Sequence, residues 1–211
     1  MAKRLVKYLV LLIVIGLFGY NSVYFKKLDA KTMEQTAETN LSPVEIAQKF
    51  WTKQFHSYLD SAVEINGFLK MLKENPKQTF EKYSQSQGIG NTSFFLVKGD
   101  GVITNISDDD VTVAAKSNND VTTIKLNTGI YFGNAVRDVT GKISMGDFSN
   151  TMDFNTVSSE LNKIVHTQIV TPFKIKAVKG AAIQFVGCVE INQEQINTDN
   201  MQVLPVKIIV K

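Results

Sequence analysis

Hydrophobic and polar positions divide this chain into three stretches with different periods. The first is an uncharged run of 18 residues, Tyr8 to Phe25, with basic residues on both sides. It is at the short end for a membrane-spanning helix, yet longer than the hydrophobic region of a typical signal peptide, and no small-x-small cleavage motif follows it. We predict an N-terminal signal anchor over residues 1–27, inserted in the membrane through residues 8–25. The bulk of the chain would then be extracytoplasmic. Cleavage stays an alternative, because anchors and signals overlap in length.

The second stretch has a helical period. Residues 28–41 are polar and without periodicity, as in a linker, and residues 42–85 form a helical segment. Ser42, Pro43 and Glu45 make a helix start, with a capping serine, proline at the first position and glutamate three residues after the cap. The apolar positions that follow predict one long amphipathic helix from Val44 to about Lys73. Asn75-Pro76 interrupts it, and a short helix from Lys77 to Ser84 follows.

The third stretch, from residue 93, has the period of strands. Three expected strands, SFFLVKGDGVITNI, DVTVAAK and VTTIKLN, are followed by a helix in VSSELNKIVHTQIV and by two further strands, AAIQFVGCVEIN and VLPVKIIV. The first expected strand, SFFLVKGDGVITNI, could also be a hairpin that turns at Gly99-Asp100-Gly101. Three strands, a helix and two strands is the order of the OB fold.

The predicted fold class is therefore α+β. We expect an OB-like five-stranded β-barrel over residues 93–211, with a helix between strands 3 and 4 and an insertion at 129–155. The membrane anchor and the long amphipathic helix precede the barrel, and the helical segment packs on it.

Charge and cysteine content narrow the function. The net charge is +3, but residues 1–27 hold five basic and no acidic residues, so 18 basic and 20 acidic residues remain and residues 28–211 carry −2. A nucleic-acid-binding domain usually has a basic field, so this class is disfavoured. The single cysteine, Cys188, lies in an apolar run and is expected to be buried. No cysteine follows the anchor to accept a lipid.

No catalytic or metal-binding motif stands out. His56 and His166 lie on separate helices without a ligand partner at a useful spacing, and there is no cysteine pair. Neither a G-x-S-x-G nor a G-x-G-x-x-G motif is present. We therefore expect no enzyme activity, no cofactor and no metal. The acidic stretch from Asp147 to Asn155 leaves two interpretations open, a cation site or the cap of a helix beginning near Asn155.

The stretch TGIYFGNAVRD, Thr128 to Asp138, combines glycines, aromatics and hydrogen-bonding side chains, as sugar sites do. On this interpretation the ligand-binding residues are Tyr131, Asn134, Arg137, Asp138 and, further along, Asp153. The alternative is structural: the glycines permit the chain to leave the barrel, the aromatics belong to the core, and Arg137 and Asp138 form an internal ion pair.

The stretches GNTSFFLVKGDG, TGIYFGNAVRD and DFSNTMDFNTVSSELNK together resemble an uncharacterised family of predicted periplasmic lipoproteins, a domain of unknown function. The resemblance covers about residues 45–210. It implies an extracytoplasmic, membrane-attached protein, often encoded beside sugar-uptake ABC transporters, and it brings no established activity or catalytic residue. Because the chain lacks the lipid-accepting cysteine, the apolar helix would replace the lipid as anchor.

Three functions follow from these observations. The first is a non-enzymatic accessory binding protein that binds a sugar or an ABC-transporter component, with the second and third strands as the binding face and Gln193 to Gln202 as one rim. The second is a hydrolase with paired carboxylates from Asp138, Asp147 and Asp153. The third is an assembly protein that uses the aromatics of its N-terminal helix, Phe50, Trp51, Phe55 and Tyr58, as interface anchors.

Overall fold

The structure, a computed structural model, describes residues 41–87, 90–117 and 120–211. The predicted anchor and nearly all of the predicted linker lie outside these residues. Leu41–Lys211 forms one compact unit. Within the described residues, no helix combines the length and the apolar character needed to cross a membrane.

The N-terminal helical segment begins as predicted but is not one helix. Ser42 caps α3 (Pro43–Lys49), and its side chain accepts from the backbone N–H of Glu45 while the Glu45 carboxylate accepts from the backbone of Ser42. A π-helical turn, η1 (Phe50–Gln54), and a 3-10 segment, η2 (Phe55–Ser61), follow. The chain then forms the short strand β1 (Val63–Glu64) before α4 (Ile65–Glu74) and α5 (Pro76–Tyr83). The predicted continuous helix from Val44 to Lys73 is therefore wrong.

Local polar side chains accompany the end of the helical segment at Ser61. Ser57 and Ser61 donate their hydroxyls to the backbone carbonyls of Gln54 and Tyr58, and such bonds compete with regular helical pairing. Val63 and Glu64 then pair in parallel with β2. The Glu64 side chain starts α4 by accepting from two backbone N–H groups of its first turn. The helical spacing of the apolar residues gives no sign of this interruption.

The sheet contains the five predicted strands, β2 (Thr92–Ile106), β3 (Asp110–Ser117), β4 (Asp120–Asn127), β5 (Ala182–Asn192) and β6 (Met201–Val210). Neighbours are antiparallel except for β4 and β6, which are parallel. Pairing runs β2-β3-β4-β6-β5 and returns to β2, while β1 lies beside β2. β2 is one long strand with an irregularity between Ile103 and Asn105, so the hairpin alternative is wrong.

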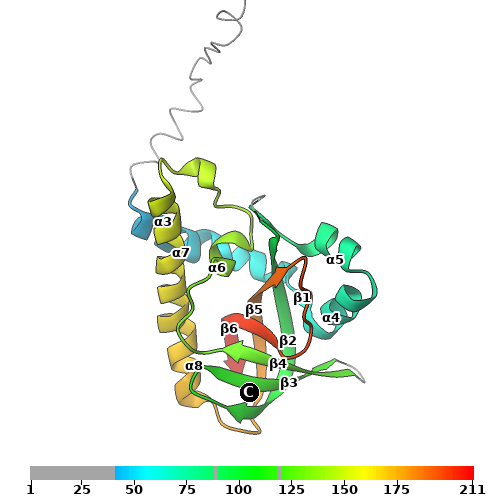
Figure 1. Cartoon of the computed structure of the whole chain (residues 1–211). Coiled ribbons are helices and arrows are strands. Elements are labelled where there is room, and N and C mark those ends of the chain that lie inside the picture. Colours follow the sequence, from blue (N-terminus) through cyan, green and yellow to red (C-terminus); the bar gives the residue numbers. More distant parts are fainter. Residues whose placement is uncertain (1–40, 88–89, 118–119) are drawn as a thin grey trace, which may run out of the picture. The chain divides into compact units, whose positions relative to one another are not determined.

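Two apolar clusters hold this sheet. One joins the inward side chains of the strands, such as Val97, Val113 and Phe185, to Phe68 and Leu72 of α4. The other lies between the outer side of β2, β5 and β6 and the helices, and it includes the aromatic residues of η1 and η2. In Figure 1 the strands accordingly lie between α7 on one side and α4 with α5 on the other.

The segment between β4 and β5 is more helical than predicted. It contains α6 (Ala135–Asp138), a 3-10 turn η3 (Met145–Asp147), α7 (Thr151–Val165), a π-helical turn η4 (His166–Val170) and α8 (Thr171–Lys176). The predicted insertion at 129–155 therefore contains helical elements, and the helix expected to begin near Asn155 begins at Thr151 instead. Asn150 caps α7, since its side-chain oxygen accepts from the N–H of Asp153 at 2.8 Å. Val157, Leu161 and Val165 form the predicted buried face.

Candidate functional site

Arg137 and Asp138 of the predicted ligand site lie in the interior. Both side chains are only 3% exposed, and they form a two-pronged ion pair, with Arg137 Nε 2.6 Å from Asp138 Oδ1 and Nη2 2.9 Å from Oδ2. Arg137 Nη1 donates to the carbonyl of Phe154 at 3.1 Å. The guanidinium carbon lies 3.4 Å from the centroid of the Phe154 ring. These contacts leave little of either charge for a ligand.

Gln87 closes this cluster from the other side. Its amide donates to Asp138 Oδ1 at 3.1 Å and to the carbonyl of Ile143 at 2.8 Å. The cluster thereby connects α6, the start of α7 and the segment before β2. This arrangement matches the structural alternative for Arg137 and Asp138, an internal ion pair that fixes the chain between β4 and α7.

Tyr131 and Asn134 lie nearer to solvent. The Tyr131 hydroxyl donates to Glu190 Oε2 on β5 at 3.0 Å. Burial, followed by the charge of Glu190, raises the pKa of this phenol. Asn134 precedes α6, and its side chain forms no capping hydrogen bond. The adjacent Phe132 is 89% exposed, so one of the two predicted aromatics is outside the core.

The acidic stretch from Asp147 to Asn155 serves helix ends. Asp147 Oδ2 accepts from the backbone N–H of Ser144 at 2.8 Å, and Asp153 Oδ2 accepts from the Asn150 side chain at 2.8 Å. In the part of the chain that the structure describes, no group of three His, Cys, Asp or Glu residues is placed to hold a metal ion. The capping interpretation of this stretch is therefore the one that the contacts support.

Cys188 lies within β5 and is 1% exposed. Its burial raises the pKa of the thiol, because the thiolate would lose its hydration. His56 lies with Nδ1 2.8 Å from the carbonyl oxygen of Trp51, in an edge contact with the Trp51 ring. Cys188 and His56 therefore both have the contacts of structural side chains.

A cavity of about 350 Å³ opens where the outer side of β2, β5 and β6 meets β1 and the end of β3. This volume falls within the range of about 300–1,000 Å³ for small-molecule sites. Strand register fixes its residues in two rows. One row runs Lys116, Asp100, Gln184 and Ile209 across four strands, and the other runs Lys98, Val186 and Lys207 across three. Glu64 and Ser117 complete its edge.

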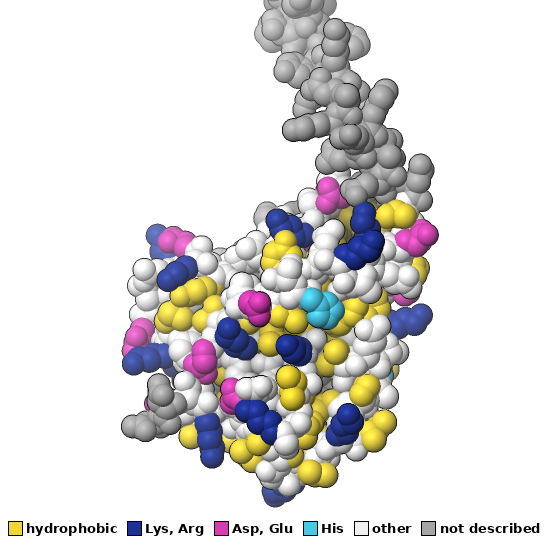
Figure 2. Space-filling model, turned by 180° about the vertical axis from the view of Figure 1, so that it is seen from behind, with side chains coloured by type: hydrophobic (Ala, Val, Ile, Leu, Met, Phe, Trp, Pro, Cys, Tyr) yellow, Lys and Arg dark blue, Asp and Glu magenta, His cyan; other side chains and the backbone are white. Residues whose placement is uncertain are grey.

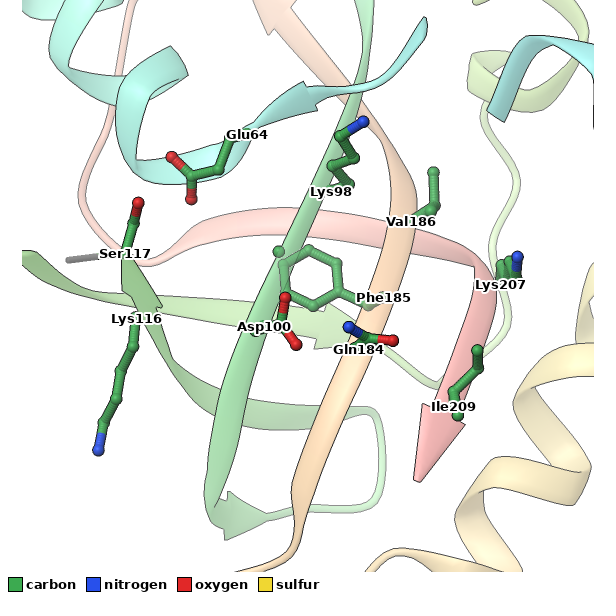
Figure 3. A pocket seen from close by; sticks show the side chains of 11 residues that line it. Glu64, Lys98, Asp100, Lys116, Ser117, Gln184, Phe185, Val186, Lys207 and Ile209 are labelled. Atoms are coloured by element: carbon green, nitrogen blue, oxygen red, sulfur yellow. The ribbon is translucent and has the colours of Figure 1, made fainter. Parts of the chain in front are cut away.

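The polar groups of the cavity differ in the hydrogen bonds and ion pairs that they form within the protein. Asp100 and Gln184 lie close together, and the three lysines lie around them (Figure 3). A hydrogen bond from Lys211, at 2.7 Å, lowers the pKa of Asp100. Lys98 donates to the carbonyl of Asp60 at 3.3 Å. Within the described residues, Lys116 and Lys207 have no ion-pair partner.

The predicted binding face on β3 and β4 contributes little to this cavity. Its outward pairs, Thr112 with Lys125 and Ala114 with Thr123, carry mostly small side chains, and Lys125 pairs with Asp110. Of that face only Lys116 lines the cavity, together with the adjacent Ser117, and no residue of the predicted rim does. The face seen from behind shows basic, acidic and apolar side chains interspersed, without a field of one sign (Figure 2).

The comparisons with known proteins give a family and a fold. A family model described as a predicted periplasmic lipoprotein (DUF2291) matches residues 13–209. None of the curated proteins matches the chain. A crystal structure of an OB-fold protein from Thermotoga maritima is similar, with a TM-score of 0.72 and 25% sequence identity over 81% of this chain and 99% of that chain. The expected OB-like strand order is thereby supported.

Proposed function

The chain belongs to the predicted periplasmic lipoprotein family, and from this premise we propose that it is a membrane-attached accessory protein of the extracytoplasmic space. On this proposal it binds a small polar ligand of sugar size and does not transform it. The observation that carries the proposal is the cavity on β2, β3, β5 and β6, with its two rows of polar side chains. A sugar ABC transporter as the system it serves stays a prediction from the family resemblance.

The composition of the cavity supports a polyhydroxylated ligand. Asp100 offers acceptors, Gln184 offers both donors and an acceptor, and the lysines offer donors. Val186 and Ile209 add an apolar surface beside these groups. One sheet holds both rows, so the strands fix the backbone positions from which these side chains reach a ligand.

The hydrolase alternative finds less support. Asp138 is buried in the pair with Arg137, Asp147 caps η3, and Asp153 is bonded to the α7 cap. Each predicted carboxylate therefore has a local structural partner. We propose a non-enzymatic function for this reason.

The aromatic residues that an assembly protein would use as interface anchors are buried or packed against the core. Phe50, Trp51 and Phe55 are buried, and Tyr58 packs beside them. Trp51 stacks on Phe55 with ring centroids 5.1 Å apart, and its indole N–H donates to Gln168 of η4. These aromatics hold the N-terminal segment against the core, as expected for a helical segment that packs on the barrel.

Calorimetric titration of residues 41–211 with a panel of simple sugars and sugar derivatives tests the proposal. The described residues of this fragment supply both apolar clusters and form one compact unit, so we expect it to fold alone. Gln184→Ala removes an exposed cavity side chain and should abolish or strongly weaken binding. Asn134→Ala, in the sequence-predicted site, should leave binding unchanged. The reverse result would move the site to the Thr128–Asp138 segment, and no binding by any compound would overturn the proposal.

A further inference from the structure

On the premise that this cavity binds a small ligand, as proposed above, we infer that the ligand is acidic. A carboxylate or phosphate group on a sugar-sized molecule would lie among Lys98, Lys116 and Lys207.

Both carboxylates of the cavity are engaged within the protein. Glu64 Oε1 accepts from the backbone N–H and the side-chain amide of Asn66, each at 3.0 Å, and Oε2 accepts from the N–H of Gly67 at 2.8 Å. Asp100 is paired with Lys211 at 2.7 Å. Each negative charge thus already has a partner within the protein, Glu64 at a helix start and the exposed Asp100 in an ion pair.

The three lysines that line the cavity are less engaged. Lys98 gives one donor to a backbone carbonyl, while Lys116 and Lys207 have no acidic partner among the described residues. Counting Lys211 with Asp100, and Glu64 as one negative charge, the cavity has four positive and two negative groups. The excess of two positive charges attracts an anion into a concave site.

Register places these charges around one point. Lys98 pairs with Val186, which pairs with Lys207, so the two lysines are two strands apart on the same outer side of the sheet. Two strand spacings correspond to roughly 10 Å between their Cα atoms, which long side chains can bridge to one anion. Lys116 lies beside Asp100 in the neighbouring row. In Figure 3 its amine points away from the centre, so contact requires a change of its exposed side-chain conformation.

The apolar part of the cavity also favours an acidic over a neutral sugar. The only aromatic residue among the lining residues, Phe185, is 2% exposed and packs inside the sheet. A neutral sugar would therefore find no open ring surface to stack against. Recognition depends instead on charge-assisted hydrogen bonds, which are stronger than neutral ones.

Calorimetric titrations of residues 41–211 with glucose, glucuronate, glucose 6-phosphate and inorganic phosphate test the inference. We expect at least one acidic sugar to bind about tenfold or more tightly than glucose. Lys98→Gln and Lys207→Gln should each weaken that acidic sugar by about tenfold and weaken glucose by clearly less, because only the acidic sugar loses a charge-assisted contact. Lys176→Gln is the matched control, since Lys176 is an exposed lysine of α8 away from the cavity.

The outcomes separate the two claims. Glucose binding as tightly as the acidic sugars would overturn the acidic ligand and leave the binding function standing. Inorganic phosphate binding as tightly as glucose 6-phosphate would overturn a sugar-sized ligand. An equal loss in Lys176→Gln would mean diffuse charge attraction and would overturn the site. Binding by none of the four compounds would overturn both claims. Unchanged melting temperatures of the variants would exclude misfolding as the cause of a loss.

Discussion

Arg137 keeps its charge in the interior through three kinds of contact. It has a two-pronged pair with Asp138, a hydrogen bond to the backbone of Phe154 and a ring contact with the same residue. A buried charge without its partner is strongly unfavourable, because the hydration it lost is no longer compensated. The pair is therefore more sensitive to removal of one member than to removal of both.

We expect Arg137→Met to lower the free energy of unfolding by about 3–5 kcal/mol, since it leaves Asp138 buried without its partner. Asp138→Leu should have an effect of similar size. The double variant should lose less than the sum of the two, because no unpaired charge remains. Urea unfolding of the three variants checks this. A loss below about 0.5 kcal/mol in the single variants, the size typical of surface changes, would contradict a buried structural pair.

The burial of Cys188 leads to a prediction about the stability of the protein at alkaline pH. Burial raises the pKa of its thiol above the ordinary value of 9.0, so the unfolded chain loses this proton at lower pH than the folded chain does. The contribution of this group to stability is therefore complete below about pH 9 and falls as the pH rises above it. We expect the free energy of unfolding to fall by up to about 1.4 kcal/mol per pH unit more in the native protein than in Cys188→Ala.

Urea titrations at pH 8, 9 and 10 measure that difference in slope. Tyr131 is shifted in the same direction but has an ordinary value of 10.0, and it is present in both proteins, so its contribution cancels. Thiol labelling offers a second measurement. Cys188 should react slowly in the native state and readily in urea. Parallel slopes together with fast native labelling would show that the thiol is accessible.

At the scale of the elements, β2 pairs with both β3 and β5, and Gly101 lies where the two pairings overlap. A Cβ atom on Gly101 would lie 2.5 Å from Val113 Cγ1 and 2.7 Å from the carbonyl oxygen of Ala114. Such distances force the neighbouring strand to move. The glycine thus permits a close approach of two backbones.

Two glycine-to-alanine substitutions should therefore change the stability of the protein in opposite directions. Gly101→Ala should destabilise by about 1–3 kcal/mol through overpacking against β3. Gly67→Ala in α4 should stabilise by about 0.5–1 kcal/mol, because alanine favours the helix and the new Cβ would meet its nearest atom at 3.5 Å. Thermal unfolding of both variants measures the signs. A neutral Gly101→Ala would show that β3 can shift without cost.

The elements also show what sequence patterns can predict. The strands and the N-terminal cap were predictable, because alternation and capping depend on nearby residues. The break at Val63 and Glu64 was not, because those residues leave helical geometry to pair with Val97 and Lys98, about thirty positions later. The helix start at Asn150 was within reach, since Asn150 and Asp153 have the spacing of a cap.

At the scale of the whole molecule, the candidate site was harder to predict than the fold. TGIYFGNAVRD is conspicuous in sequence because it mixes glycine, aromatic and charged residues, but a buried ion pair uses the same residue types. The lysines of the cavity come from three separate strands and become neighbours only through register. In the sequence each of these lysines stands alone on its own strand, so no local pattern shows that they come close together in the fold.

The attachment to the membrane gives a final prediction. The family is described as one of lipoproteins, yet the sequence contains one cysteine, and Cys188 is 1% exposed within β5. A lipid chain on that sulfur would require β5 to separate from its neighbours. We therefore expect the uncharged run from Tyr8 to Phe25 to hold the protein in the membrane.

Fractionation of cells that express the full chain tests this. Cys188→Ala should stay in the membrane pellet after a carbonate wash and should carry no less fatty-acid label than the native protein. Leu12→Arg combined with Ile15→Arg should leave the pellet, because each central arginine disfavours insertion by about 2.5–3.5 kcal/mol. Ser22→Arg, near the end of the run, is the control and should be tolerated. Release of Cys188→Ala, or retention of the double arginine variant, would show that the apolar run is not the anchor.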